Sequence, residues 1–407
     1  MGPKDPAAGD PAKAAALAAL AAVRPHWGAV QPARSAVGLP GRTLLHAGPP
    51  YADAARPAAP VLSSAALACV HEGWADSIEA ALALIAAREV TLAPAQSYGV
   101  VLPLAAVAGP GTALVGVADG AGAAPRAWSL LGSGAGPQIR FGTRDPAILP
   151  RLRWRDQELA PRLHEIVSAA PVDLIALARQ GLAGGDDLHA STAAAQAALA
   201  ALLARALRPA AQPADARIGQ MLEGSPLFFL TLWMAACHLM LDAAARQAHG
   251  SACALVVALA GNGRDLGVRL AGQPRRWFVS PAPPPAGPRL DPAGMAPAAA
   301  LVGDSGVIDA AGFGAQALAL APAVQQALAP WLPPDWRERP QRLLQGPHPL
   351  FADLGLRVGA DAAAGLAPLA AIAMVAADGA GGLLGRGIAM LDDEVFRRAA
   401  RGLAEGA

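Results

Sequence analysis

Short apolar runs, each ended by glycine or proline, dominate the chain between residues 98 and 141. They span 100–107, 113–117, 127–131 and 138–141. Runs of this length between turn-forming residues predict β-strands. A further apolar strand is predicted at 43–46, where the chain turns into Ala47-Gly48-Pro49-Pro50.

Helix signals mark other parts of the chain. An alanine-rich run at 14–23 predicts a helix near the N-terminus. Asp76-Ser77-Ile78-Glu79 places an acceptor at the cap position with a glutamate three residues later, as a capping box does, and predicts the start of a further helix. Asp145-Pro146 opens a mostly helical stretch to about 208, and Ser225-Pro226 opens a buried helix ending near 248. Proline at a first helical position loses no hydrogen bond that the helix needs.

Strands return in the last third of the chain. They are predicted at 253–260, 266–271, 277–279, in a glycine-rich strand and turn at 301–308, and at 370–376. A helix is expected at about 315–329, and Asp392 is expected to cap a last one. Because strands and helices are segregated without a regular βαβ rhythm, the pattern predicts an α+β fold with mixed sheets. It excludes a doubly wound Rossmann sheet.

A chain of 407 residues is expected to form more than one domain. The changes of pattern predict an N-terminal helix and connection, a first α/β domain, an inserted small helical subdomain, and a second α+β domain with a proline-rich loop at 280–297. Their boundaries are set at 1–42, 43–144, 145–220 and 221–407.

Composition narrows the possible functions. Charged residues make up 15% of the chain and the formal net charge is +1, which excludes an electrostatic site for nucleic acid or an anionic membrane. Cys69, Cys237 and Cys253 lie in apolar stretches without metal-ligand spacing, as in a reducing cytosol, so no metal is predicted. The apolar stretch 226–241 is shorter than the roughly 20 residues that a membrane span needs. We therefore expect a cytoplasmic protein without a membrane segment or a bound cofactor.

Gly261-Asn262-Gly263 lies between two apolar strands and predicts a tight hairpin with a type I′ turn. The same turn could face a substrate, with Arg269 as an anion clamp. The glycine spacing differs from the dinucleotide fingerprint, and a strand follows where a helix should, which argues against a nucleotide site.

Further places along the chain carry candidate chemistry, each with a structural alternative. Gly303-Asp304-Ser305-Gly306 could present a carboxylate and a hydroxyl, or bond its own backbone. The acidic turn 184–189 could cap a helix or supply His189 as a general acid or base. His46 ends a buried strand, where a histidine is either structural or a ligand contact. Arg140 and Arg153 could bind an anion or be ordinary charges.

Together these motifs resemble the YlbE-like family over about residues 12 to 405. The matching segments include Leu44–Pro50, Arg140–Gly142, Leu152–Trp154, Gly185–Asp187 with His189, Pro226–Leu230, Asn262-Gly263, Gly267–Arg269, Arg276–Phe278, Gly303–Ser305, Gly312–Gly314 and Gly385–Phe396.

The resemblance implies an α+β fold of unusual topology, distinct from the aspartate transcarbamylase fold, whose STRT and HPxQ motifs are absent. It also implies a subunit of an oxamate carbamoyltransferase in allantoin breakdown, of the AllG type. That reaction moves a carbamoyl group between oxalurate and phosphate and gives oxamate and carbamoyl phosphate. An acyl-CoA-synthetase-like partner subunit is implied, and a homo-oligomer is expected.

If the chain is catalytic, the predicted site combines proton-transfer and polarising groups with anion-binding groups. The catalytic candidates are His189, Asp186, Asn262, Asp304 and His46, and the substrate- or anion-binding candidates are Arg269, Arg140, Arg153, Ser305 and Gly263.

Several polar positions depart from the family pattern. Gln96-Ser97-Tyr98 stands where the family tends to have a histidine-rich run, Ala190-Ser191 replaces an Asn-Arg pair, and Ser225 replaces an asparagine. Losing imidazole and guanidinium groups removes proton-transfer and anion-binding capacity. A non-catalytic paralogue that is structural or binds a small anion is therefore the alternative hypothesis.

Overall fold

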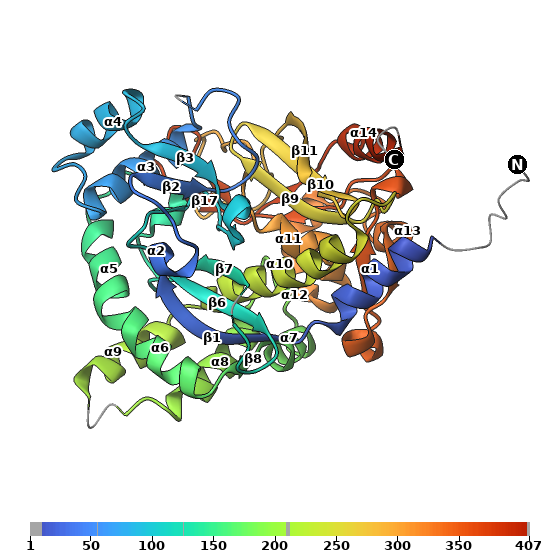
Figure 1. The fold of residues 1–407 in the computed structure, drawn as a ribbon, viewed down its shortest axis with the longest axis horizontal. Helices are drawn as coiled ribbons and strands as arrows, with labels where there is room; N and C mark the ends of the chain where they lie inside the picture. The colour runs from blue at the N-terminus through green and yellow to red at the C-terminus, as the bar shows by residue number, and fades with distance from the viewer. Residues whose placement is uncertain (1–9, 55, 125, 209–211, 405–407) are drawn as a thin grey trace, which may run out of the picture.

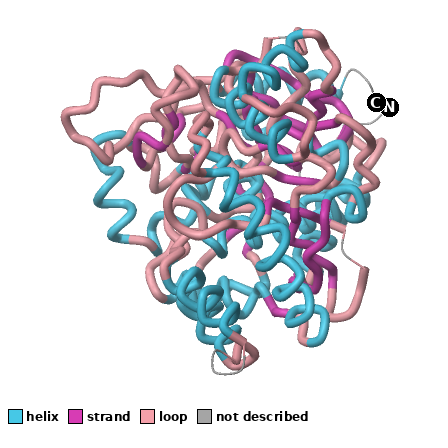
Figure 2. Tube along the Cα trace, turned by 90° about the vertical axis from the view of Figure 1, so that its left-hand side faces the viewer, coloured by secondary structure: helices cyan, strands magenta, loops and turns pink. Residues whose placement is uncertain are grey.

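The computed structural model describes residues 10–54, 56–124, 126–208 and 212–404. Two larger sheets and several small ones are combined with helices that lie mostly outside them (Figures 1 and 2). Helix α10, Phe228–Ala248, lies between the two larger sheets and contacts both. The α+β prediction is confirmed.

The first large sheet has the strand order β4-β7-β6-β1-β8. Its strands are β4 Val100–Val101, β7 Ala127–Leu130, β6 Ala113–Asp119, β1 Pro25–Pro32 and β8 Val172–Asp173. Strand β1 pairs with β6 and β8, although the sequence predicts only a connection at 25–32. One sheet therefore joins strands from three of the four segments proposed as domains.

The second large sheet is antiparallel in the order β11-β10-β9-β12. Its strands are β9 Val256–Asn262, β10 Asp265–Leu270, β11 Gln273–Pro281 and β12 Val302–Gly303. The predicted hairpin joins β9 to β10, but the prediction of a type I′ turn is wrong. Positive φ falls on Gly263, at 84°, and not on Asn262 or Arg264, which is the pattern of a type II′ turn.

A three-stranded sheet positions the loop after β2, which contacts the candidate site. Strand β2, Thr43–His46, lies between β3, Thr91–Pro94, and β5, Val107–Ala108. Helices α3, Ala59–His71, and α4, Ile78–Ala86, follow β2. The predicted start of α4 is confirmed, but its N-cap is Ser77, whose side chain accepts from the Ala80 amide, and not the Asp76 of the predicted box.

The remaining regular elements cover the two large sheets or fold back at the C-terminal end. The helices are α1 Pro11–Ala22, α2 Ala33–Ala36, α5 Ile148–Trp154, α6 Ala160–Ala169, α7 Leu174–Ala183, α8 Ala193–Ala204, α9 Pro213–Glu223, α11 Gly306–Ala310, α12 Pro322–Leu328, α13 Arg339–Leu343 and α14 Asp393–Ala404. The small strands are β13 Leu344–Pro347, β14 Arg357–Ala360, β15 Ala370–Ala371, β16 Met374–Val375, β17 Leu383–Gly385 and β18 Ile388–Ala389.

Four predicted strands differ from the structure. The run 370–376 is divided into β15 and β16, which belong to different two-stranded sheets. The run 138–141 is a 3₁₀ turn, Ile139–Phe141, closed by Gly142 with φ 68°. The run 100–107 is interrupted because Leu102 leaves the ladder and bonds Asp304 through both its amide and its carbonyl. The segment 301–308 turns into helix α11 directly after β12.

Helix α10 is long and apolar enough to cross a membrane by length and composition. However, 89% of its apolar window is buried inside the protein. It is packed by α1 on one side and by strands of both large sheets on others. The predicted buried helix is therefore confirmed, and its composition reflects its place in the core.

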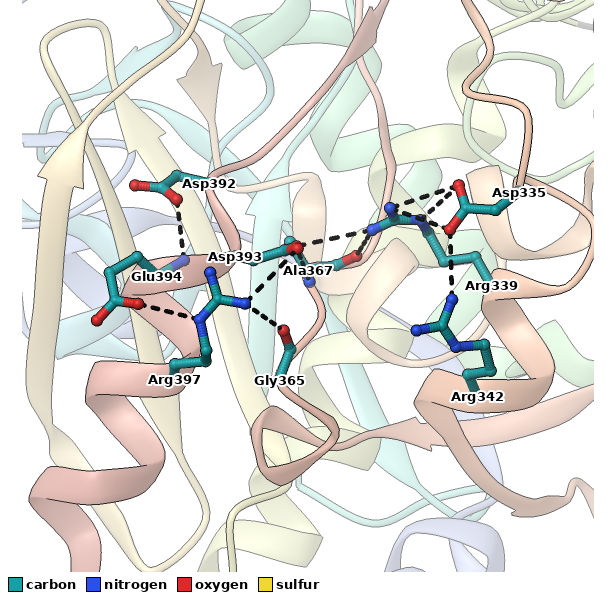
Figure 3. Close-up of polar contacts among 9 residues, drawn as sticks. All are labelled: Asp335, Arg339, Arg342, Gly365, Ala367, Asp392, Asp393, Glu394 and Arg397. Atoms are coloured by element: carbon teal, nitrogen blue, oxygen red, sulfur yellow. Dashed lines mark hydrogen bonds and ion pairs between the residues drawn. The ribbon is translucent and has the colours of Figure 1, made fainter.

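The C-terminal helix α14 is fastened by charged groups at its start (Figure 3). The Asp392 carboxylate accepts from the Glu394 amide at 2.9 Å, as predicted for its cap. Asp393 accepts from the Ala367 amide and lies 3.7 Å from Arg339 of α13, which also pairs with Asp335. These contacts join α13 and α14 across the 365–367 loop.

Candidate functional site

The turn after β12 holds a fully buried carboxylate, Asp304. One oxygen accepts from the Gly48 amide at 3.0 Å and from the Gln96 side chain at 2.7 Å, and the other accepts from the Leu102 amide at 2.9 Å. Burial raises the pKa of Asp304 to about 6, against the lowering effect of these donors. Asp304 therefore ties three separate segments of the chain to one turn.

Gln96 connects Asp304 to Arg269. While its amide nitrogen donates to Asp304, its oxygen accepts from the Arg269 guanidinium. Arg269 also donates to the Pro274 carbonyl at 2.9 Å and stacks over Trp277, 4.6 Å from the ring centre. Burial lowers the pKa of Arg269 to about 10, so it stays protonated at neutral pH. The glutamine that departs from the family pattern thus bridges a buried acid and a buried base.

The hairpin residues are engaged in packing the loop after β2. Asn262 donates to the Pro49 carbonyl at 3.0 Å, and its oxygen accepts from the amides of its own turn. A Cβ on Gly48, whose φ is 81°, would lie 2.4 Å from the Gly261 carbonyl carbon. Only glycine fits this close approach of two backbones.

His46 lies beside this contact. Its Nδ1 is 2.8 Å from the Ala47 carbonyl, its Nε2 is buried without a partner, and its ring is 4.7 Å from the Tyr51 ring. Burial lowers the pKa of His46 to about 4, so the ring is neutral.

His189 forms a buried pair with Asp309 of α11. The distance from His189 Nδ1 to the Asp309 carboxylate is 2.8 Å. The other Asp309 oxygen accepts from the Ala315 and Ala371 amides. These amides fix the carboxylate, which fixes the imidazole with Nδ1–H donating and Nε2 left for another group.

The acidic turn before His189 caps a helix. Asp187 accepts from the amides of His189, Ala190 and Ser191. Asp186 accepts from the Ser191 hydroxyl and the Ala195 amide near the start of α8. The turn thereby presents the imidazole while its own carboxylates bond the backbone.

His189 faces a cavity of about 250 Å³ whose wall also contains Arg140, Ser305, Leu104 and Arg386. The Arg140 side chain is 8% exposed, and burial lowers its pKa to about 10. Its guanidinium has no hydrogen bond or ion pair with any residue that the structure describes. Arg386, exposed at the rim, likewise pairs with no carboxylate in the described ranges. The cavity thus combines a fixed imidazole, a hydroxyl and two uncompensated cations.

Comparisons with known proteins identify the family of this chain. The model of the family "Oxamate carbamoyltransferase subunit AllG" matches residues 90–305. The subunit of that name from Escherichia coli K12 is 33% identical over 326 residues, which are 77% of this chain and 75% of the relative. This chain belongs to the AllG family.

Two other relatives extend the match. An uncharacterized protein from Escherichia coli K12, YahG, is 27% identical over 90% of this chain and 80% of its own. A crystal structure of a conserved protein of unknown function from Enterococcus faecalis V583 covers 97% of both chains with a TM-score of 0.87 and 24% identity. The latter shows that the fold is shared.

In this AllG family member, the predicted site residues fall into two adjacent groups. Asp304 and Arg269 belong to the network around Gln96, whereas Asn262 and His46 contact the 47–51 loop, whose Gly48 donates to Asp304. Gly263 lies in the hairpin turn, and its amide donates to the Leu301 carbonyl. His189, Arg140 and Ser305 line the cavity, and Ser305 follows Asp304 directly. Arg153 is exposed and lines a different groove, together with His71 and Asp156, so it does not join either group. Catalytic roles for these residues stay predictions.

Sequence reasoning missed Asp309, Gln96 as a bridge, and Arg386. Asp309 had a usable signal, because it is the only charged residue between Asp304 and Asp335, and a lone charge in an apolar run needs a partner when buried. Within the described ranges, no three His, Cys, Asp or Glu side chains are grouped so that they could hold a metal ion.

Proposed function

We propose that this chain is a carbamoyl-transferring subunit of an oxamate carbamoyltransferase-type complex, with its substrate in the cavity beside His189. The observation that carries this proposal is the His189–Asp309 pair, which faces the unpaired Arg140 and Arg386 in one cavity. Cations without acidic partners attract a small carboxylate such as oxalurate or oxamate. The membership in the AllG family supports the same substrate class.

The reaction assigns each group a role. A phosphate oxygen attacks the terminal ureido carbonyl carbon of oxalurate, the C–N bond to the oxamate part breaks, and carbamoyl phosphate forms. The departing amide nitrogen needs a proton. His189 Nε2 would take this proton from the attacking hydrogen phosphate and pass it to the nitrogen, while Asp309 stabilises the imidazolium. Ser305 would donate to the carbonyl oxygen as negative charge develops on it. Arg386 would hold the oxamate carboxylate at the rim.

The network around Gln96 would act indirectly. Asp304 directly precedes Ser305, and its hydrogen bonds to Gly48 and Leu102 fix the turn that presents the hydroxyl. We therefore treat Asp304, Arg269 and Asn262 as positioning residues. Partner subunits, including an acyl-CoA-synthetase-like protein, belong to the same proposal.

The test is formation of carbamoyl phosphate from oxalurate and phosphate by the complex reconstituted with its partner subunits. We expect His189→Gln to lower kcat by at least about 10²-fold, the usual contribution of a general acid. His249→Gln, at an exposed histidine, is the matched control and should leave turnover unchanged. Equal turnover in both variants would contradict a catalytic His189 and favour the non-catalytic, anion-binding alternative.

A further inference from the structure

A second cavity, of about 350 Å³, adjoins the one beside His189. The two walls share Pro103, Arg140, Phe141, Leu227 and Leu383. The second cavity is further lined by a glycine-rich loop, 132–136, and by the residues that lead into helix α10. The reaction roles assigned to the first cavity use no group from this loop or from the start of the helix.

Arg140 carries a positive charge into the space between the cavities. Its side chain is more than nine-tenths buried, and its Nε has no hydrogen-bond partner. A buried charge without a counter-charge is costly, so such a guanidinium favours the entry of an anion. Arg155, also on this wall, is already paired with Asp156 at 2.7 Å and is not available in the same way.

The start of α10 is a second source of positive potential. The helix has 21 residues, and its N-cap residue, Leu227, provides no side-chain acceptor. The first-turn amides of a long helix carry a partial positive charge and bind anions when nothing caps them. Leu227, Phe228 and Thr231 of this turn line the second cavity. The Phe228 amide already donates to the Ser225 carbonyl at 2.9 Å, so the donors left in this turn are the amides that follow it.

The glycine-rich loop presents bare backbone to the same place. Its carbonyls at Ser133 and Ala135 accept from Arg151, while the amides of 132–136 donate to no residue in the part of the chain that the structure describes. A Cβ at Gly132 would lie 3.1 Å from Phe228, and one at Gly134 would lie 2.7 Å from Met221. The loop therefore lies close to the start of α10 at Gly132 and close to α9, which carries Met221, at Gly134. Glycine permits such close backbone approaches in phosphate-cradling loops.

From this geometry we infer that the second cavity is a phosphoryl-binding subsite, built by the 132–136 loop, the start of α10 and Arg140. Donors that converge from a loop, a helix end and a guanidinium suit a tetrahedral oxyanion better than a planar carboxylate. The role of this subsite in the reaction rests on the proposed function, because a phosphoryl group here lies next to the cavity assigned to the carbamoyl carbon. Free phosphate and the phosphoryl end of carbamoyl phosphate share this chemistry.

Hydrogen–deuterium exchange on the full unmodified chain tests the site without a mutation. We expect inorganic phosphate and carbamoyl phosphate to slow exchange at 132–136 and 226–231, and not in the β13–β14 hairpin. If only carbamoyl phosphate does so, the subsite takes the phosphoryl group as part of a larger ligand, which still supports it. Oxamate should not protect these segments. Protection by oxamate but not by phosphate, or by none of the three, overturns the inference.

Titration calorimetry with inorganic phosphate measures the contribution of the Arg140 side chain to binding. Arg140→Gln should weaken phosphate binding at least about tenfold, the loss expected for a charge-assisted pair, whereas Arg153→Gln should bind like the unmodified chain. Equal affinity in Arg140→Gln, folded by circular dichroism, overturns the role of Arg140. Protection by phosphate or carbamoyl phosphate without carbamoyl transfer in the complex would remove the proposed function and leave the subsite. Transfer without protection by either of them would remove the subsite and leave the proposed function.

Discussion

Replacing Gln96 by leucine should destabilise the protein strongly, although the two side chains have similar volumes. The side chain is 6% exposed and joins two charged groups, donating to Asp304 and accepting from Arg269. Leucine keeps a comparable volume but removes both hydrogen bonds. Because each hydrogen bond to a charged group contributes about 1.5–3 kcal/mol, we expect a loss of about 3–5 kcal/mol in the free energy of unfolding.

Gln196 provides a matched control. It is 2% exposed, donates once to the neutral Leu222 carbonyl at 2.8 Å, and has an oxygen that is buried without a partner. Gln196→Leu removes one neutral hydrogen bond and also an unsatisfied acceptor, so its cost should stay below about 1 kcal/mol.

Equilibrium unfolding in urea, followed by tryptophan fluorescence at constant pH, measures both variants. A cycle with Arg269→Met should show coupling of at least about 1 kcal/mol between positions 96 and 269, because the two side chains are in direct contact. If Gln96→Leu costs no more than Gln196→Leu, or the cycle shows no coupling, Gln96 does not bridge the two charges and the network described above is wrong.

Three further predictions concern the same region. Since the pKa of Asp304 rises from 3.8 to about 6 on folding, the stability that its protonated form contributes is fully present below pH 3.8 and is lost as the pH rises through about 6. The stability of the protein relative to Asp304→Asn should therefore fall by about 2–2.5 kcal/mol between pH 4 and pH 7, and a flat difference would contradict the shift. Gly48→Ala should cost more than about 2 kcal/mol through clash with Gly261, whereas Gly38→Ala, with φ 64° and open space, should cost about 1 kcal/mol in the same urea assay. Asp309→Asn should lower kcat of the reconstituted complex by about 10²-fold or more with less effect on KM, because an amide cannot hold the same imidazole tautomer. A change in KM with kcat unaltered would argue against this role.

Local signals in the sequence were enough for features that one segment decides. The cap at Asp392, the hairpin at 261–263 and the buried helix after Ser225 each depend on residues within a few positions, and each is present. The type of the hairpin turn was wrong, because Asn262 uses its side chain to bond Pro49 and its own turn instead of adopting positive φ.

Contacts between residues that lie far apart in the sequence could not be predicted. His189 and Asp309 are 120 positions apart, and Gln96 meets Asp304 across 208, so no local pattern indicates either pair. Arg153 and Arg155 look equivalent in sequence, yet the turn of the helix exposes the first and buries the second beside Asp156. Which arginine meets an anion therefore depends on helix phase and on the neighbouring elements.

The charged groups around the two cavities favour a small anion, whichever residue is catalytic. The nearby carboxylates are already occupied: Asp304 and Asp309 accept from backbone amides and from Gln96 and His189, and Asp187 caps its own turn. Arg140 and Arg386 face the cavities without acidic partners in the described ranges. Because Arg140 is a buried cation without an acidic partner in the described ranges, an anion beside it would offset the cost of burying its charge, whatever group transfers the proton. A variant that keeps the fold but adds a carboxylate to this wall should therefore exclude oxalurate and phosphate together.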